Sequence, residues 1–113
     1  MIDAHIEDIV PVFHVSDMEK SLDFFKDTLK FQSGFVAEDY SFAIIKLSQT
    51  AIHLVRVSKD QKINPAVSYI WCKEIEQLAE KLDQQVSVTP YQMKEFKITD
   101  PDGNYLIFGE NSE

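Results

Sequence analysis

The hydrophobic positions along the first half of the chain change period in a definite order. The segment 9–15 alternates and is rich in β-branched residues, which predicts a strand. Apolar side chains then recur at the spacing of one helical face, at Met18, Leu22, Phe25 and Leu29. Three strand-like segments separated by acidic or Ser/Gln/Thr turns follow, at 31–36, 41–47 and 51–57. This half is therefore predicted to fold in the order β-α-β-β-β.

The second half repeats this order of elements. After a polar connector at 58–65, residues 66–72 are strand-like. Helical spacing returns within 74–82, at Ile75, Leu78, Ala79 and Leu82. Three short strands are then predicted, at 86–89, 93–99 and 105–109. The repeat lies in the order of elements rather than in residue identities, so two βαβββ modules are predicted.

Short motifs place the ends of some elements. Ser16 is a favourable N-cap and Glu19 completes a capping box, so the first helix is predicted to begin there and to end near Lys30. The run Asp100-Pro101-Asp102-Gly103 predicts a tight turn between the last two strands, because proline presets φ and glycine tolerates the permissive position. The spacing needed for a calcium loop is missing from this run.

These elements predict an α+β fold in which two βαβββ modules form curved antiparallel sheets backed by helices. The 113 residues are the size of a single domain, 1–113, with module one at about 9–57, the connector at 58–65 and module two at about 66–110. The helices cover one face of the sheets. The other, concave face must then hold a ligand, a partner subunit or both.

Charge and composition exclude several classes of protein. The net charge of −8 argues against a nucleic-acid-binding surface, which depends on Lys and Arg, and would instead attract a cationic ligand. Cys72 is the only cysteine, so no internal disulfide or thiolate metal cluster can form, and its predicted helix-side position favours a structural thiol over a nucleophile. The N-terminal sequence lacks the features of a secretion signal, and no segment is apolar enough to span a membrane. We therefore expect a cytoplasmic protein.

Two segments of the chain resemble a known superfamily. VPVFHVSDMEKSLDFFKDTLKF, at the first strand and helix, and MKEFKITDPDGNYLIFGE, at the closing hairpin, are similar to the vicinal oxygen chelate superfamily of glyoxalases, bleomycin-resistance proteins and dioxygenases. The resemblance covers residues 9–110 and is closest to the bleomycin-resistance proteins. It implies a small non-enzymatic homodimer that sequesters a cationic glycopeptide antibiotic in grooves between subunits. It also implies exchange of N-terminal arms, which Ile2 and Ile6 would anchor here.

The resemblance also bears on metal binding. Enzymes of the superfamily hold a divalent metal with one inward side chain, typically His, Gln or Glu, on each of four strands. Those places correspond here to Val10, His53, Val67 and Ile107. Three aliphatic side chains offer no lone pair to a cation, so we expect no metal, no other cofactor and no catalytic residue.

Strand parity predicts which side chains line the concave face, because alternate residues of a strand share a face. His14, Tyr69 and Trp71 are expected on this face, whereas Phe13 and Ile70 should pack under the helices. Parity, together with the aromatic positions that the resemblance assigns to ligand stacking, predicts these ligand-binding residues: Phe35, Tyr40, His53, Tyr69, Trp71, Tyr91 and Glu95. Packing at a domain or dimer interface would explain the aromatic residues equally well.

Three functions remain open from the sequence. The preferred one is a metal-free small-molecule binding protein of the bleomycin-resistance type, which sequesters a cationic or aromatic compound in a dimer groove and confers antibiotic resistance. The segment 83–90 is shorter than the loop that forms one groove wall in those proteins, which leaves the ligand's identity open. The alternative is a glyoxalase-like or dioxygenase-like metal-dependent enzyme, with these candidate residues: His5, His14, His53, Glu95 and Glu110. The third is a dimer that regulates or scaffolds another protein.

Overall fold

The computed structural model describes residues 2–111, the last of these through its backbone only. The first half contains the short 3-10 helix η1 (Ile2–His5), then β1 (Val12–Val15), α1 (Met18–Asp27), β2 (Gln32–Val36), β3 (Phe42–Leu47) and β4 (Thr50–Arg56). The second half contains β5 (Val67–Trp71), α2 (Ile75–Lys81), β6 (Ser87–Val88), β7 (Met93–Thr99) and β8 (Tyr105–Asn111). The predicted βαβββ order is confirmed in both halves.

The strands form two four-stranded sheets of the same topology. The strand order is β1-β4-β3-β2 in the first sheet and β5-β8-β7-β6 in the second. Neighbouring strands are antiparallel except for β1 with β4 and β5 with β8, which run parallel. The predicted α+β architecture is confirmed, but the expected antiparallel pairing fails at one edge of each sheet. The cause is the long connection through a helix and a hairpin, which returns the fourth strand beside the first in the same direction.

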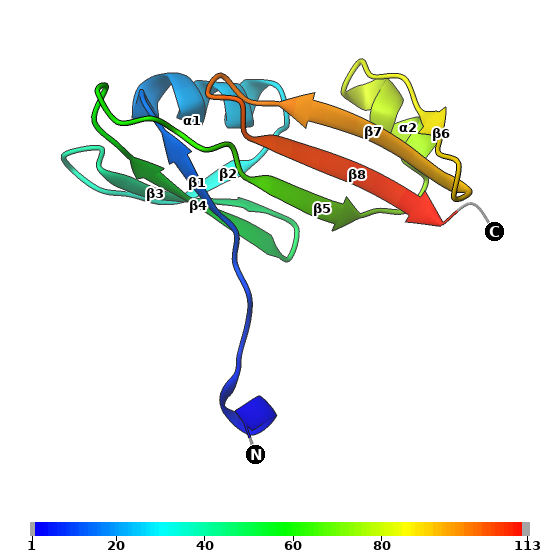
Figure 1. The fold of residues 1–113 in the computed structure, drawn as a ribbon, viewed down its shortest axis with the longest axis horizontal. Coiled ribbons are helices and arrows are strands. Elements are labelled where there is room, and N and C mark those ends of the chain that lie inside the picture. The colour runs from blue at the N-terminus through cyan, green and yellow to red at the C-terminus, as the bar shows by residue number, and fades with distance from the viewer. Residues whose placement is uncertain (1, 112–113) are drawn as a thin grey trace.

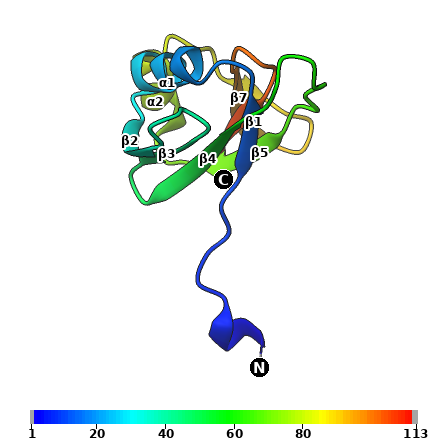
Figure 2. The ribbon, with the colours of Figure 1, turned by 90° about the vertical axis from the view of Figure 1, so that its left-hand side faces the viewer.

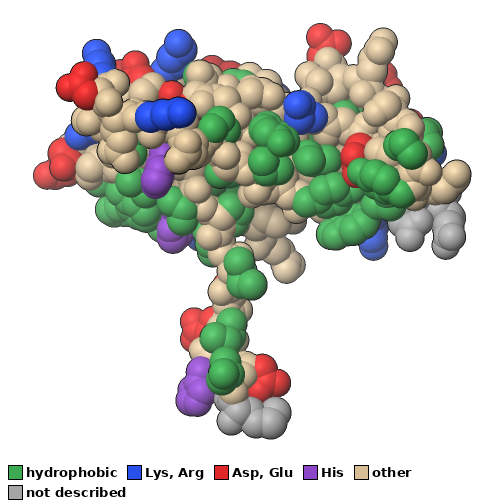
Figure 3. Space-filling model, viewed as in Figure 1, with side chains coloured by type: hydrophobic (Ala, Val, Ile, Leu, Met, Phe, Trp, Pro, Cys, Tyr) green, Lys and Arg blue, Asp and Glu red, His purple; other side chains and the backbone are tan. Residues whose placement is uncertain are grey.

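Both helices lie on the same side of the sheets (Figures 1 and 2). Alternation along the strands explains this arrangement. Phe13 and Leu106 are buried on the helix side, whereas Val12 is 46% exposed on the other side. We call the side away from the helices the open face; it carries, among others, Val12, His53, Val67, Tyr69, Trp71, Glu95 and Ile107. Figure 3 shows hydrophobic side chains gathered along this side of the body.

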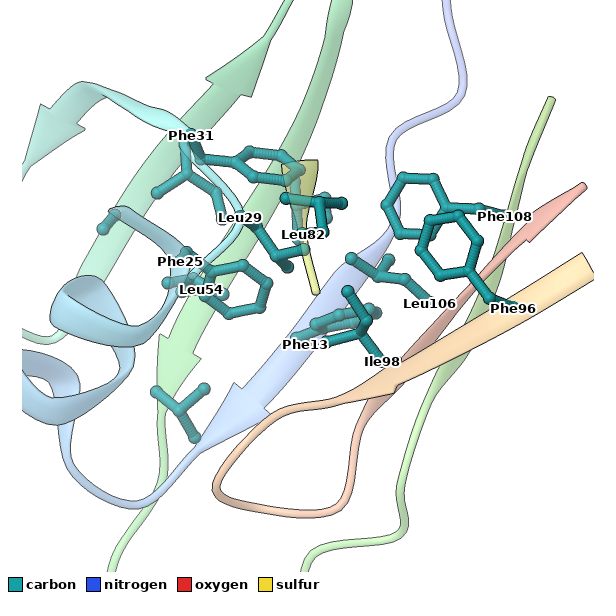
Figure 4. Close-up of a cluster of buried hydrophobic side chains, with 14 of the residues drawn as sticks. Phe13, Phe25, Leu29, Phe31, Leu54, Leu82, Phe96, Ile98, Leu106 and Phe108 are labelled. Atoms are coloured by element: carbon teal, nitrogen blue, oxygen red, sulfur yellow. The ribbon is translucent and has the colours of Figure 1, made fainter. Parts of the chain in front are cut away.

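One cluster of buried hydrophobic side chains joins the two sheets to the helices (Figure 4). The rings of Phe13 and Phe25 lie between β1 and α1 with their centroids 6.2 Å apart. In the second sheet, the rings of Phe96 and Phe108 stack at 4.8 Å. Burial of each such side chain contributes about 1.5–3 kcal/mol to the free energy of folding. Packing within this cluster is therefore the main interaction that holds the helices against one side of the sheets. The helix-side position predicted for Phe13 is confirmed.

The largest differences from the predicted element boundaries are at the start of β1 and the end of α1. β1 begins at Val12 rather than at residue 9, and Ile9 is 88% exposed. α1 ends at Asp27, before the predicted end at Lys30. Lys30 has a φ of 63°, a left-handed conformation that cannot continue an α-helix. The hydrophobic periodicity ran past the true helix end because Leu29 packs into the core after the helix has stopped.

The predicted N-cap of α1 was also wrong. Asp17, rather than Ser16, caps the helix, and its carboxylate accepts a hydrogen bond from the Lys20 backbone N–H at 3.1 Å. The backbone N–H and the hydroxyl of Ser16 instead donate to the Asp102 carboxylate, at 3.1 and 2.6 Å. Asp17 supplies the capping oxygen one residue later than predicted, and Ser16 instead donates to a charged acceptor in the other module.

The turn between β7 and β8 fastens the two modules together. The side chain of Asn104 is completely buried. Its amide group donates to the His14 carbonyl at 2.9 Å and to Asp100 Oδ2 at 3.0 Å, and its oxygen accepts from the Ala66 backbone N–H at 2.8 Å. With the contact between Ser16 and Asp102, these bonds tie β1 and α1 to the start of β5. We call Ser16, Asp102 and Asn104 the module clasp.

The N-terminal segment projects away from the body of the molecule (Figures 1 and 2). We call residues 2–10 the N-terminal arm. Its isoleucines are largely exposed: Ile2 by 81%, Ile6 by 60% and Ile9 by 88%. The chain joins the first sheet at Pro11, whose carbonyl accepts a hydrogen bond from the His53 backbone N–H at 3.0 Å. The arm therefore presents apolar side chains that its own chain leaves uncovered.

Candidate functional site

On the open face of the second sheet, two tyrosines contact one carboxylate and a tryptophan packs against one of the tyrosines. Tyr69 and Trp71 lie on β5, Tyr91 lies on the turn between β6 and β7, and Glu95 lies on β7. β8 separates β5 from β7, so the group spans three strands and a turn. All four residues are among the predicted ligand-binding residues, and the structure brings them together. We call them the Glu95 cluster.

Two phenols donate hydrogen bonds to the Glu95 carboxylate. The Tyr69 hydroxyl donates to Oε2 at 2.7 Å. The Tyr91 hydroxyl is shared between the two carboxylate oxygens, at 3.1 and 3.2 Å. Partial burial of the Tyr69 phenol, together with its hydrogen bond to Glu95, raises the pKa of Tyr69 to about 12. Tyr69 is therefore protonated at neutral pH and keeps its role as a donor.

Gly109 makes the contact between Tyr69 and Glu95 possible. It lies in β8, in register with Trp71 on one side and with Glu95 on the other. A Cβ on Gly109 would overlap the Tyr69 hydroxyl, so the Tyr69 ring crosses β8 only because this residue has no side chain. Sequence reasoning did not identify Gly109. The available signal was the glycine at the end of the predicted strand 105–109, because a glycine in a strand often marks the close approach of another group.

The aromatic faces of the cluster remain accessible. The ring centroids of Tyr69 and Trp71 are 5.0 Å apart, with the planes tilted by 59°. Trp71 is 66% exposed and Tyr91 is 65% exposed. Figure 3 shows acidic atoms bordered by hydrophobic ones at the end of the body where β7 and β8 lie. A molecule that reached Glu95 would therefore contact aromatic surface at the same time.

Glu95 has no cationic partner among the residues that the structure describes. No lysine, arginine or histidine within residues 2–111 lies at ion-pair distance from its carboxylate. Lys97, two residues along the same strand face, instead places its amine 4.6 Å from the centre of the Tyr105 ring. Lys94 projects to the helix side, where it pairs with Glu76 at 2.7 Å. Glu95 therefore keeps a negative charge that no side chain of the described residues neutralises.

The other predicted residues lie on the first sheet. The ring of Phe42 links two of them, with centroids 6.3 Å from Phe35 and 5.2 Å from His53. Phe42 itself was not predicted. Tyr40 lies on the turn between β2 and β3, where its φ of 59° places it in the left-handed region. The predicted ligand-binding residues thus divide between the two sheets.

A cleft of about 590 Å³ adjoins the Glu95 cluster. Its walls are Asp8 and Ile9 of the N-terminal arm, the start of β4, and residues 68–71 of β5. Tyr69 and Trp71 belong both to this wall and to the Glu95 cluster. The volume is within the range of small-molecule sites, about 300–1,000 Å³.

Comparison with solved structures identifies the fold. A bleomycin-binding protein from Streptomyces verticillus, solved with copper(II)-bleomycin, matches with a TM-score of 0.77 and 22% identity over 91% of this chain and 94% of that chain. A lactoylglutathione lyase from Agrobacterium tumefaciens matches with a TM-score of 0.70 and 13% identity over 95% and 96%. A glyoxalase-related enzyme from Clostridium phytofermentans matches with a TM-score of 0.76 and 19% identity over 94% and 95%. This chain has the glyoxalase/bleomycin-resistance fold.

The resemblance seen in the sequence is confirmed at the level of this fold. No protein-family model and no curated protein matches the sequence. The glyoxalase/bleomycin-resistance fold carries both ligand-binding proteins and enzymes among the matched structures. None of the helices in the described part of the chain has the length and apolar sequence of a membrane span.

The positions that the resemblance assigns to a metal in this fold do not fit one here. His53 lies in register with Val12 of β1 and Ile44 of β3, so its strand neighbours are aliphatic. Val67 and Ile107 offer only hydrocarbon at two further positions. Between residues 2 and 111, no three His, Cys, Asp or Glu side chains gather in a way that could hold an ion. A single imidazole does not repay the lost hydration of a divalent cation.

The remaining candidates for catalysis do not converge on one place. His5 lies on η1 in the N-terminal arm, and His14 is an exposed residue of β1. Glu110 accepts a hydrogen bond from the Ile75 backbone N–H at 3.1 Å, so it caps the start of α2 on the helix side. Burial raises the pKa of the Cys72 thiol, which disfavours the reactive thiolate, as the predicted structural role requires.

Proposed function

We propose that the chain is a metal-free binding protein for a small organic molecule, of the bleomycin-resistance type. The observation that carries this proposal is the Glu95 cluster, in which accessible aromatic side chains lie beside a carboxylate that has no cationic partner among residues 2–111. Such a surface suits a cationic or aromatic compound, because aromatic rings stack on flat ligands and attract cations through their faces. The matched protein that was solved with copper(II)-bleomycin supports a ligand of this kind. Sequestration of an antibiotic would be the corresponding cellular role.

We further infer that the protein acts as a cytoplasmic homodimer in which the N-terminal arms are exchanged. The exposed isoleucines of the arm support this inference, because an apolar segment that leaves its own body gains by burial against a second copy. β5 is an edge strand and β1 is another, so each offers unpaired backbone groups to an incoming segment. In such a dimer the first sheet of one copy and the second sheet of the other would together enclose the ligand.

A fluorescence titration tests the binding proposal, because Trp71 is the only tryptophan. We expect a saturable change in Trp71 emission with bleomycin or with one of a panel of unrelated aromatic cations. Tyr91→Ala should weaken that binding about tenfold by removing one aromatic contact. Val88→Ala is the matched control, because Val88 is exposed on the neighbouring edge strand but is not part of the Glu95 cluster. The proposal fails if no compound gives a saturable change.

Metal analysis separates this proposal from the enzyme alternative. A lactoylglutathione lyase is among the matched structures, so a metal-dependent enzyme is the natural competitor. We expect the purified protein to contain less than one equivalent of Ni, Zn, Fe and Mn, because three of the four expected ligand positions are aliphatic. A stoichiometric, tightly bound ion would favour the enzyme.

A further inference from the structure

We propose that the Glu95 cluster binds the nitrogen of an alkylated ammonium group, tertiary or quaternary, on an organic ligand. This inference rests on the proposed function and specifies which charged group the site recognises. Three features of the cluster carry it: the unpaired charge of Glu95, the hydrogen bonds that already occupy its oxygens, and the aromatic rings beside it.

The charge of Glu95 favours a cation over a neutral ligand. No basic side chain within residues 2–111 pairs with it, and Lys97, the nearest lysine on the same strand face, points to Tyr105 instead. The phenols of Tyr69 and Tyr91 donate hydrogen bonds to the carboxylate but carry no positive charge, so they do not neutralise it. The chain as a whole carries a net charge of −8, so a cation approaches it with favourable long-range electrostatics.

The hydrogen bonds at Glu95 select among cations. A carboxylate has about four lone-pair sites, and the two phenols take sites on both oxygens. A guanidinium group binds a carboxylate through two parallel hydrogen bonds, one to each oxygen, and here both oxygens already accept phenols. A primary ammonium carries three N–H donors, and the phenols leave Glu95 few lone-pair sites to accept them. A tertiary ammonium has one N–H donor and a quaternary ammonium has none. Such a group therefore needs at most one acceptor from Glu95 and loses little when the phenols occupy the other lone-pair sites.

The aromatic rings supply the contact that an alkylated ammonium needs. Its methyl groups spread the charge over an apolar surface, which aromatic faces bind through their negative quadrupole within about 6 Å of the ring centre. Trp71 gives the strongest such face and stands 66% exposed beside Tyr69. Gly109 leaves room for the Tyr69 ring beside Glu95, because any side chain at this position would displace the Tyr69 hydroxyl.

Three small probes test this inference through Trp71 emission: choline, ethanolamine and 3,3-dimethylbutan-1-ol. The last has the shape of choline without its charge, and ethanolamine has the charge without the methyl groups. We expect choline to give a saturable change. Both other probes should bind about tenfold more weakly, because each lacks either the charge or the apolar surface around it.

Two variants with one matched control assign the effect to Glu95. Glu95→Gln should weaken choline binding about fivefold by removing the local charge. Glu80→Gln, on the exposed side of α2, removes the same charge from the chain and should change binding by less than about twofold. Tyr91→Phe keeps the ring but frees a lone pair of Glu95 for an N–H donor. The ratio of the Kd for ethanolamine to the Kd for choline should therefore fall about threefold.

The outcomes distinguish this inference from the broader proposal. If 3,3-dimethylbutan-1-ol or ethanolamine binds as tightly as choline, or if Glu95→Gln behaves like Glu80→Gln, the ammonium assignment is overturned. The binding function would then still stand on any saturable change with bleomycin or an aromatic cation. If no compound of either panel changes Trp71 emission saturably, both the assignment and the function are overturned.

Discussion

Gly109 controls the geometry of the Glu95 cluster through the side chain that it lacks. It faces the same side as Tyr105 and Ile107, but it leaves open the space that a side chain would fill between Trp71 and Glu95. The Tyr69 ring occupies that space and reaches Glu95. Among the described glycines, Gly103 has a positive φ but Gly109 does not, so the backbone conformation at Gly109 does not require glycine. Its importance is therefore steric and local.

Replacing Gly109 tests this steric role. In Gly109→Ala the new methyl group must displace the Tyr69 hydroxyl, which breaks the hydrogen bond to Glu95 and exposes the phenol to water. The pKa of Tyr69 should then fall from about 12 toward the ordinary value of about 10. Absorbance of tyrosinate across an alkaline titration measures this shift, and Tyr69→Phe identifies the phenol responsible. An unchanged titration in Gly109→Ala would show that Tyr69 can reach Glu95 past a side chain.

At the scale of the elements, the turn between β7 and β8 acts as a fastener between the modules. Asp102 accepts two hydrogen bonds from Ser16 at the entrance of α1. Asn104 connects the end of β1 to the residue before β5. Both contacts join a residue of the first module to a residue of the second. They therefore help to fix the orientation of the first sheet relative to the second. The module clasp thus fixes the relative position of the two open faces.

Loss of the Asp102 contact should destabilise the folded chain. In Asp102→Ala the Ser16 N–H and hydroxyl lose a charged acceptor in a partly buried place. We expect a decrease of about 1–3 kcal/mol in the free energy of unfolding, measured by urea denaturation. Asp60→Ala in the exposed connector is the control and should change stability by less than about 0.5 kcal/mol. Equal stabilities of the two variants would contradict a fastening role.

The whole molecule has one covered side and one uncovered side. Both helices pack on the same side, and the open face carries exposed aromatic and aliphatic side chains. The N-terminal arm adds further exposed apolar residues away from the body (Figure 2). Covering such surfaces with a second copy, a ligand or both removes their apolar area from water. The dimer with exchanged arms and the ligand site are therefore connected proposals.

Removal of the arm should weaken the dimer. A variant in which residues 2–8 are deleted loses the exposed Ile2 and Ile6 that would anchor the exchange. We expect the full chain to sediment as a dimer at micromolar concentration and the shortened chain to shift toward the monomer. Ile6→Ser should give an intermediate result, whereas Glu7→Ser should resemble the full chain, since Glu7 is a polar neighbour in the same arm. A monomeric full chain at this concentration would contradict the exchange.

Some of this protein could be predicted from its sequence, because local periodicity reports which way a side chain points. The alternation in β1 and β5 correctly placed Phe13 on the helix side and Trp71 on the open face. The order of strands and helices followed from the same periodicity. Glu95 was expected on the open face because it alternates with Phe96, which is buried on the helix side.

Only the tertiary structure decided which of these residues meet, because contacts between distant strands depend on register and direction rather than on local pattern. Ser16 looked like a helix cap, yet its partner is Asp102 in the other module. Glu95 meets Tyr69 across an intervening strand only where Gly109 leaves space. The parallel pairing of β1 with β4 and of β5 with β8 also arises from the path of the chain. The local sequence therefore determines which face of a sheet a side chain occupies, whereas the tertiary fold determines which distant residues it contacts.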